Sequence, residues 1–390
     1  MNAARDAGEF TVATTTADVE ALRPAWQARG VSYVDAELDY FLALVRTRPE
    51  VIGPYVIVMG RPEEPDALVV ARTERAPFPC RLGYTTLYRP VLRTLRVSHG
   101  GIAGADDDGT AAKVVRRIEA ALAGGSADVA VVPAVRLGSA LDRALKRIPA
   151  GVRLGRFADP AVHRRLVLPQ SYEQLLATRD RKSRYNLKRQ RAQLEKEFGD
   201  DLRFDVLSRP EDFDRIFADL ESIAAKTYQR GLAAGFADTL ERRELARVAL
   251  ERGWFRAWVL AIGERPVAFW QGNVLGRTYY SSSTGYDPEF TRQGVGTVLL
   301  LRVFEDLCGD PDVDVVDFGW GDADYKARWG NEEWYEHDLV VFAPSARGVR
   351  VNAIRTGILG ADRAARRLGR ATGLTAKVKR RWRSRLRAES

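Results

Sequence analysis

The sequence is poor in the residues that build disulfide frameworks and metal centres. Its 390 residues include two cysteines, Cys80 and Cys308, and three histidines. Two cysteines are too few for a disulfide framework, and the histidines do not cluster with them at the spacing of a zinc site. We therefore expect a protein without a bound metal, and the low cysteine content fits a reducing cytoplasm.

Long apolar runs are also missing. The N-terminal segment lacks the apolar core of a signal peptide, and no run of about 18 apolar residues occurs in the chain. We expect no membrane span and predict a cytoplasmic protein. Attachment to the inner face of a membrane is left open.

The chain has little excess charge except at its end. It contains 61 Lys and Arg against 52 Asp and Glu, a formal net charge of +9. Residues 345–390 carry 14 of the basic residues and only two acidic ones, so this segment has a charge of +12 and the body before it −3. The basic excess, which could indicate a nucleic-acid partner, therefore belongs to a tail.

The hydrophobic pattern of the sequence predicts a layered α/β protein made of two similar halves. At ~100–200 residues per domain, and with 45% hydrophobic residues, the chain can form two cores. Each half reads as helix, antiparallel meander, helix, strand and helix. In the first half we expect strands at 9–13, 55–59, 67–71, 83–97 and 128–132, and helices at 16–27, 111–122 and 137–147. In the second half we expect strands at 255–262, 267–274, 278–283, 313–318 and 339–342, and helices at 172–198, 210–252, 294–307 and 323–329.

One turn has the composition of an anion-binding site. The glycine-containing run Gln293, Gly294, Val295, Gly296 and Thr297 follows an aromatic strand and leads directly into an amphipathic helix. Glycine lets the backbone approach an anion closely, and the N–H groups and dipole of a helix N-terminus favour a pyrophosphate. We expect these five residues to bind a nucleotide-containing cofactor. The alternative is a tight strand-to-helix turn without a ligand, and the spacing fits neither a Rossmann fingerprint nor a P-loop.

The meander, this turn and the helix after it resemble the GNAT acyltransferase superfamily. In that family a Gln/Arg-x-x-Gly-x-Gly/Ala turn holds the pyrophosphate of acetyl-CoA, so the resemblance implies acetyl-CoA or another acyl-CoA as donor. Only Gly294-x-Gly296 aligns cleanly, because Thr291 stands at the first position of the motif.

A second signature narrows the resemblance. Residues 314–330, DVVDFGWGDADYKARWG, are similar to a strand–loop–helix of the tandem-GNAT group, which includes FemAB-type ligases and acyltransferases of cellulose and exopolysaccharide biosynthesis. The basic helix 181–199 also resembles an element of that group. The resemblance implies two tandem GNAT-like domains with mixed central sheets flanked by helices. The predicted domains are a degenerate GNAT-like copy at 1–160, a GNAT domain with the acyl-CoA site at 161–345, and a basic amphipathic helical tail at 346–390.

Four polar residues of this signature are candidate catalytic groups. The resemblance places Tyr325 where GNAT enzymes often carry the tyrosine that protonates the leaving thiolate. It places Lys326 where FemAB-type ligases carry a lysine, whose three donors can stabilise an oxyanion or bind an acidic substrate group. Asp317 is a candidate base or a cap of the 319–321 loop. Asp322 is an alternative base or the N-cap of the next helix.

Residues of the meander next to the turn are candidate substrate contacts. Strand alternation sends about half of them to the core and half to the site, and the pattern does not choose between the faces. The candidates are Trp270, Gln271, Tyr280, Ser281 and Ser283, with Tyr228 added because the resembling family often has an aromatic near that position. Cys308 has no histidine at a catalytic spacing and is interpreted as structural.

Two basic segments remain. Residues 179–191 contain seven Lys and Arg against one Asp, and we interpret them as a solvated helix face with Leu187, Leu194 and Phe198 turned inward. Contact with a phosphorylated acceptor or tRNA is the alternative. The tail is expected to contact an anionic membrane surface or to pack on the body. Its apolar residues at helical spacing are Val351, Ile354, Ile358, Ala361, Ala365 and Leu368.

The leading hypothesis is an N-acyltransferase that moves an acyl group, with acetyl expected, from acyl-CoA to an amine. The acceptor class is a small molecule, an amino sugar or an amino acid. Because no Ser–His or Cys–His pair is recognisable, we expect direct attack by the amine. The alternatives are a FemAB-type aminoacyl-tRNA-dependent transferase with a peptidoglycan-like acceptor, and a non-catalytic scaffold that binds a membrane or a partner.

Overall fold

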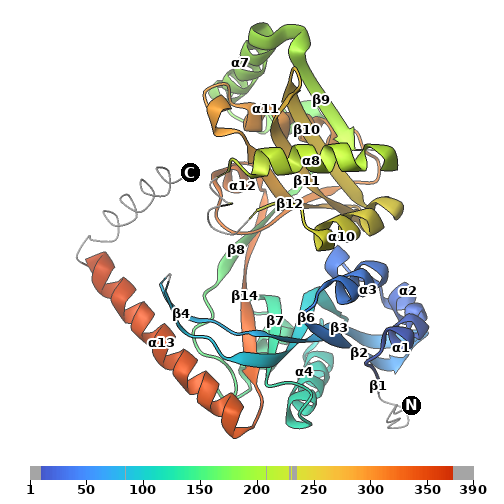
Figure 1. The fold of residues 1–390 in the computed structure, drawn as a ribbon, viewed down its shortest axis with the longest axis vertical. Helices are drawn as coiled ribbons and strands as arrows, with labels where there is room; N and C mark the ends of the chain where they lie inside the picture. Colours follow the sequence, from blue (N-terminus) through green and yellow to red (C-terminus); the bar gives the residue numbers. More distant parts are fainter. Residues whose placement is uncertain (1–9, 84, 208, 228–229, 231–234, 372–390) are drawn as a thin grey trace. The chain divides into compact units, whose positions relative to one another are not determined.

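The computed structural model describes residues 10–83, 85–207, 209–227, 230 and 235–371. These residues form two compact units. The first contains the described residues up to Val162 together with those from Trp334 onward, and the second contains His163–Glu333. Each unit is a mixed sheet with helices packed on it (Figure 1), which confirms the predicted layered α/β class.

The sheet of the first unit has the strand order β1-β2-β3-β6-β7-β14. Neighbours are antiparallel except β6 and β7, which run parallel. The strands are β1 (Phe10–Ala13), β2 (Val51–Arg61), β3 (Glu64–Pro77), β6 (Val91–Ala103), β7 (Val129–Arg136) and β14 (Glu332–Phe342). A separate hairpin consists of β4 (Cys80–Leu82) and β5 (Thr85–Tyr88).

Helices cover both faces of this sheet because its central strands are apolar on both sides. Val56, Val58 and Val70 pack in a core with the N-terminal helices, and Ile57 and Val69 pack in a second core on the opposite face. The N-terminal elements are α1 (Thr16–Ala21), α2 (Arg23–Arg29), the 3₁₀ turn η1 (Val34–Ala36) and α3 (Leu38–Thr47). The opposite face is covered by α4 (Asp108–Ala123) and α5 (Ala140–Lys146), and α13 (Ala346–Ala371) runs beside β4 (Figure 1).

The sheet of the second unit repeats the same plan with the order β9-β10-β11-β12-β13-β8. Again one pair is parallel, β12 with β13, and the others are antiparallel. This shared topology confirms the predicted internal duplication. The strands are β8 (Ala161–Val167), β9 (Leu202–Leu207), β10 (Phe255–Ile262), β11 (Arg265–Leu275), β12 (Thr278–Tyr286) and β13 (Val315–Trp320).

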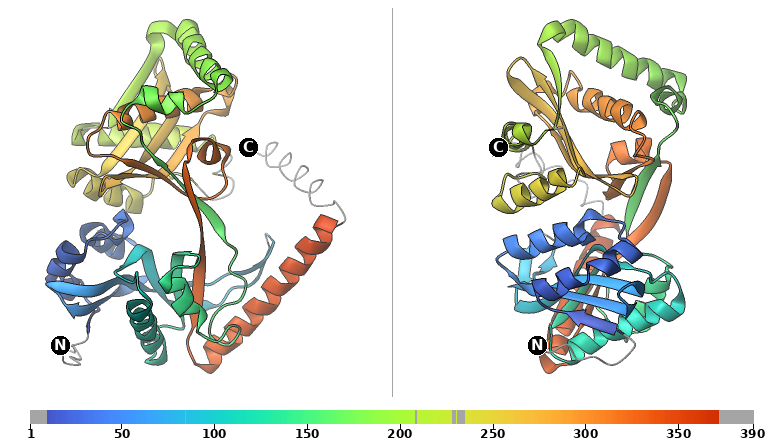
Figure 2. Two further views of the ribbon diagram at one scale, coloured as in Figure 1. Left: turned by 180° about the vertical axis from the view of Figure 1, so that it is seen from behind. Right: turned by 90° about the vertical axis from the view of Figure 1, so that its right-hand side faces the viewer.

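The helices of the second unit also lie on two faces, as the right-hand view of Figure 2 shows. One face carries α6 (Tyr172–Ala177), α7 (Arg181–Phe198) and α11 (Val295–Cys308), with α12 (Asp324–Trp329) at the end of β13. The other carries α8 (Phe213–Ala224) and α10 (Leu240–Glu251), where Phe217 contacts Phe255. Three 3₁₀ turns complete the unit: η2 (Gly199–Asp201), η3 (Pro210–Asp212) and η4 (Pro288–Phe290).

Several element boundaries differ from those expected. The helix predicted at 172–198 is two helices, because the Asp180 side chain accepts the N–H of Ser183 at 2.8 Å and begins a new helix there. The strand predicted at 83–97 is divided between the β4–β5 hairpin and β6. The strand β14, which the sequence assigned to the second half, pairs with β7 of the first unit, and α13 also belongs to that unit.

Candidate active site

The parallel strands of the second unit separate soon after they meet. Their ladder ends at the pair Tyr280–Asp317, although β12 continues to Tyr286 and β13 to Trp320. Beyond this point the backbone of β12 has no ladder partner on the β13 side among the residues that the structure describes. An extended ligand with amide groups can therefore pair with this edge of β12.

Helix α11, which follows β12 through η4, begins with an open N-terminus. Its N-cap, Gly294, is left-handed with φ of 68°, and no side chain of the described residues caps the helix. The N–H groups of Thr297 and Val298 donate to the Gly294 carbonyl. The N–H groups of Val295 and Gly296 have no backbone acceptor within the described chain. Together with the helix dipole they form a site for an anion.

Close neighbours restrict the residues that this turn can carry. A Cβ atom on Gly294 would lie 1.5 Å from Nε2 of Gln190 on α7, and one on Gly296 would lie 3.1 Å from the Tyr286 ring. The positive φ of Gly294 adds a backbone reason for glycine. Gln190 and Tyr286 were not expected from the sequence, because no local pattern marks a residue that packs on a distant turn.

The side chain of Gln293 is turned toward α7 rather than toward the open helix end. Its Nε2 donates to Oε1 of Glu197 at 3.2 Å. The contact ties the turn to α7, so any contact of Gln293 with an anion would come from its backbone.

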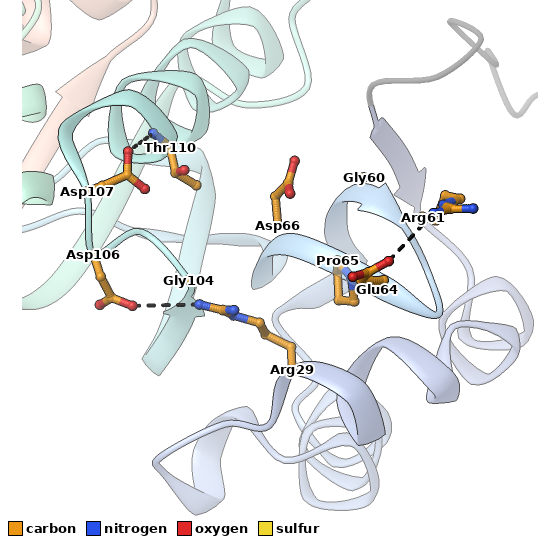
Figure 3. A pocket seen from close by; sticks show the side chains of 10 residues that line it. All are labelled: Arg29, Gly60, Arg61, Glu64, Pro65, Asp66, Gly104, Asp106, Asp107 and Thr110. Atoms are coloured by element: carbon orange, nitrogen blue, oxygen red, sulfur yellow. Dashed lines mark hydrogen bonds and ion pairs between the residues drawn. The ribbon is translucent and has the colours of Figure 1, made fainter.

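The corresponding turn of the first unit already holds a carboxylate. The N-cap of α4 is Asp107, which accepts the N–H groups of Gly109 and Thr110 at 2.8 and 2.9 Å. These hydrogen bonds keep the pKa of Asp107 below its usual value. The cavity of about 890 Å³ beside it is lined by Glu64, Asp66 and Asp106 among others (Figure 3). This turn disfavours a phosphate group because Asp107 already uses its N–H donors.

The strands of the first unit differ from those of the second in what packs on them. The parallel strands of the first unit separate after the pair Arg96–Val131, but Tyr33 packs on β6 just beyond it. A Cβ atom on Gly100 would lie 2.4 Å from the Tyr33 ring, and this ring contacts His99 edge-on at 4.2 Å. The two units therefore differ at this turn and at this strand, and the degeneracy of the first copy stays a prediction.

Asp317 is buried where β12 and β13 separate. It is 3% exposed, and its Oδ1 lies 2.7 Å from Nε2 of His163, a residue of β8 that is fully buried. The same oxygen accepts the N–H of Gly319 at 2.7 Å. These contacts fit the loop-capping alternative for Asp317. The sequence did not single out His163, since an isolated histidine in a strand belongs to no motif.

Lys326 lies over the loop that Asp317 holds. Its Nζ donates to the carbonyl oxygen of Trp320 at 2.8 Å and lies 3.4 Å from that of Gly319. Burial lowers the pKa of Lys326, and the nearby Asp317 partly opposes this shift. Two loop carbonyls thus fix an ammonium group that has three protons to donate.

Tyr325 stands in an aromatic cluster. Its ring meets Trp270 edge-on at 5.3 Å and Phe318 at 5.8 Å between centroids. Trp270, expected as a substrate contact, is only 3% exposed and belongs to the core. It orients Tyr325 by packing.

The remaining candidates on the meander lie near the point where the strands separate. Tyr280 is opposite Asp317 in the ladder, and burial, reinforced by that carboxylate, raises the pKa of Tyr280 to about 12. Gln271 donates to Oγ of its register partner Ser283 at 2.6 Å, and the register of β12 shifts by one residue between Ser281 and Ser283. Tyr228 lies outside the described residues.

Asp322 and Cys308 are placed away from these groups. The Asp322 side chain is 78% exposed and pairs with Arg164 at 2.6 Å, whereas the N-cap position of α12 is occupied by Ala323. The expectation that Asp322 caps this helix is therefore wrong. Burial raises the pKa of the Cys308 thiol to about 11, as expected of a structural cysteine.

Helix α7 presents a row of cations on its outward face. Leu187 and Leu194 are buried as predicted. The side chains that face outward include Arg181, Lys182, Lys188 and Arg189, none of which has an ion pair within the described residues. Among these residues there is also no group of three or more His, Cys, Asp or Glu that could hold a metal ion.

The duplicated mixed sheet, with an open helix end beside separating strands in the second unit, is the arrangement that the resemblance to tandem GNAT proteins predicts. Residues 181–327 match the family model described as "Acetyltransferase (GNAT) domain". These residues are therefore similar to a GNAT acetyltransferase domain, and they lie within the second unit.

Comparison with solved structures agrees with this fold. FemX aligns with a TM-score of 0.57 at 10% identity, covering 85% of this chain and 96% of that one. The C-terminal domain of a putative lysylphosphatidylglycerol synthetase from Agrobacterium fabrum aligns with a TM-score of 0.51 at 12% identity, covering 88% and 98%. A tandem GNAT protein from the clavulanic acid pathway gives 0.46 at 12%, covering 87% and 100%. A search of curated proteins found no match.

Proposed function

We propose that this acyltransferase moves an acyl group, acetyl in the simplest case, from acyl-CoA to the amine of a small molecule, an amino sugar or an amino acid. The observation that carries this proposal is the uncapped N-terminus of α11 beside the unpaired edge of β12. The N–H groups of Val295 and Gly296 suit a pyrophosphate, and the edge from Ser281 to Tyr286 suits the amides of a pantetheine arm. The GNAT match supports the donor class, because GNAT domains use acyl-CoA.

The chemistry requires one addition and one elimination. The amine nitrogen attacks the thioester carbon, a C–N bond forms, and the C–S bond breaks with its electron pair on sulfur. The amine loses one proton and the thiolate gains one, which yields an amide and free CoA. The protein must therefore stabilise a transient oxyanion and supply a proton to sulfur.

The geometry suggests a role for each candidate group. We assign proton donation to the Tyr325 hydroxyl, because Trp270 and Phe318 hold its ring. Lys326 is the donor for the oxyanion, and Asp317 holds the loop that positions Lys326. Gln271, Tyr280, Ser281 and Ser283 are assigned to substrate contact along β12.

The cations of α7 favour a second candidate, a donor attached to tRNA. Four basic side chains without ion partners lie on the helix whose Gln190 contacts Gly294. A row of such charges suits a polyanion, and its binding would weaken steeply with salt. In this candidate the acceptor is peptidoglycan-like.

The cellular location that we propose for the reaction depends on where its donor occurs. No helix of the described residues is long and apolar enough to cross a membrane. We place the reaction in the cytoplasm, where both donors occur, and a role in polysaccharide biosynthesis stays a prediction.

Calorimetry and thiol release test the proposal together. We expect CoA to bind the folded protein and free thiol to appear when acetyl-CoA is supplied with a panel of amino sugars and amino acids. Filter binding with aminoacyl-tRNA separates the two donors. A folded preparation that binds charged tRNA but not CoA would exclude the acyl-CoA proposal.

A further inference from the structure

Helix α13 buries two polar side chains and leaves several apolar ones exposed. Asn352 is fully buried and Asp362 is 8% exposed, whereas Val349 is 40% and Ile354 36% exposed. A surface helix usually shows the opposite arrangement, because burial of apolar area stabilises it. Part of the apolar surface of α13 therefore stays uncovered by the first unit.

Polar contacts hold the helix in this orientation. The Asp362 carboxylate accepts the N–H of Gly83 at 2.8 Å, and Arg347 donates to the carbonyl of Val91 at 2.6 Å. On the same inner side Val351 packs in a small core with Phe342. Rotating α13 to bury its apolar stripe would break these bonds, so the stripe stays outward.

The outward face combines small apolar residues with cations. Ala353, Ile354, Gly357, Ala361 and Ala365 are all exposed. Arg350 and Arg367 are exposed as well, and neither has an ion pair within the described residues. The only acidic residue of α13 is the buried Asp362, and residues 372–390 add seven Lys and Arg against one Glu.

We propose that this outward face of α13 docks on an anionic phospholipid surface. The apolar residues enter the interface, and the cations Arg350 and Arg367 of the helix meet the lipid phosphates. Charge complementarity selects this occupant, because the face carries basic groups without exposed acids. A nucleic acid fits less well, since the described part of α13 contains no aromatic residue for base stacking. The docking adds a location to the acyltransferase and does not depend on its donor.

Vesicle co-sedimentation of the full chain tests the docking. Wild-type protein is expected to sediment with vesicles of phosphatidylcholine and phosphatidylglycerol and to remain in solution with phosphatidylcholine alone. Ile354→Glu combined with Ala361→Glu should lower the partition coefficient about tenfold or more, because two charges enter the apolar contact. The matched control is Ile52→Glu with Leu240→Glu, which changes the net charge equally at two exposed apolar residues, 59% and 73% exposed, outside α13. The control is expected to partition like the wild type.

A second pair of variants removes the cations and keeps the apolar face. Arg350→Gln with Arg367→Gln should also weaken binding to the anionic vesicles, while the exposed pair Arg61→Gln with Arg209→Gln should not. Thermal melts verify that each variant is folded. Equal sedimentation of wild type and both α13 variants overturns the proposal. So does preferential binding to an RNA oligonucleotide that the α13 substitutions abolish.

Discussion

Each unit contains one buried histidine bonded to a buried aspartate, but the two pairs support different structures. Nε2 of His163 lies 2.7 Å from Asp317, and Nε2 of His337 lies 2.8 Å from Asp142. Asp317 also holds the loop whose carbonyl groups fix Lys326. Asp142 instead accepts from Gly138 and Lys146 in the first unit. The His163–Asp317 pair lies at the candidate active site and the His337–Asp142 pair does not, so substitutions in the two pairs can be compared directly.

Replacing each histidine with glutamine should separate these roles. His163→Gln and His337→Gln each disturb a buried charged hydrogen bond and are expected to cost about 2–4 kcal/mol of unfolding free energy. Only His163→Gln should lower kcat, by about tenfold, because it loosens the loop under Lys326. Denaturant unfolding and steady-state kinetics measure the two effects. Equal loss of kcat in both variants would assign His163 a purely structural role.

The lowered pKa of Lys326 predicts an alkaline limit to activity. The ammonium form donates to the oxyanion, so the rate should fall as the pH rises through this pKa, which lies below the ordinary 10.5. Lys326→Arg keeps its charge at higher pH and should move the fall upward, whereas Lys326→Met should reduce the rate about 100-fold at all pH values. A pH profile of kcat checks both. An unchanged alkaline limb in Lys326→Arg would remove Lys326 from that assignment.

Stability has its own pH dependence at the same residue. Between the lowered pKa and 10.5 the unfolded chain binds more protons than the folded one, so the unfolding free energy rises with pH in this window. Lys326→Met should flatten the rise.

At the level of elements, the strand-to-helix turn is the feature on which the donor site depends. Gly294 has a positive φ and lies against Gln190. Gly276, in the β11–β12 turn, has φ of 54°, but a Cβ atom there would meet no other atom within 4 Å. At both positions the positive φ disfavours any residue with a side chain. Only Gly294 lies at the open helix end.

Gly294→Ala and Gly276→Ala therefore form a matched pair. Each should cost about 1 kcal/mol of stability through backbone strain. Gly294→Ala should also raise the Kd for CoA about tenfold, since it displaces the N–H groups of Val295 and Gly296. Calorimetry with CoA is the measurement. The turn would lose its assigned role if both variants bound CoA like the wild type.

The periodicity of the sequence predicted most elements but not all of their limits. The helix 294–307 and the strand 255–262 agree closely with α11 and β10, because long apolar periods identify such elements. The single helix expected at 172–198 was wrong, since the side chain of Asp180 acts as a cap only once its backbone is extended. A correctly predicted helix still left open which of its faces is buried. In α13 the predicted apolar residue Val351 is buried, whereas Ile354 is exposed.

At the level of the whole molecule, one of two similar units carries the open helix end. A ligand stabilises only the state and the region that bind it. CoA should therefore slow amide exchange in α11 and β12 of the second unit and leave α4, capped by Asp107, unchanged. Hydrogen-exchange mass spectrometry with and without CoA gives the answer. Protection of α4 equal to that of α11 would show that the first copy also binds donor.

The sequence by itself determined the fold class, the duplication, the glycine turn and the separation of a basic tail from a nearly neutral body. These properties depend on local composition and on periodicity, which a sequence displays directly. Only the tertiary structure decided that His163 meets Asp317, that Gln190 contacts Gly294 and that Trp270 belongs to the core. It also decided that β14 pairs with β7 and that α13 faces outward with its apolar side. Such contacts join residues far apart in the chain, and their choice depends on which faces remain to be buried when the sheets assemble.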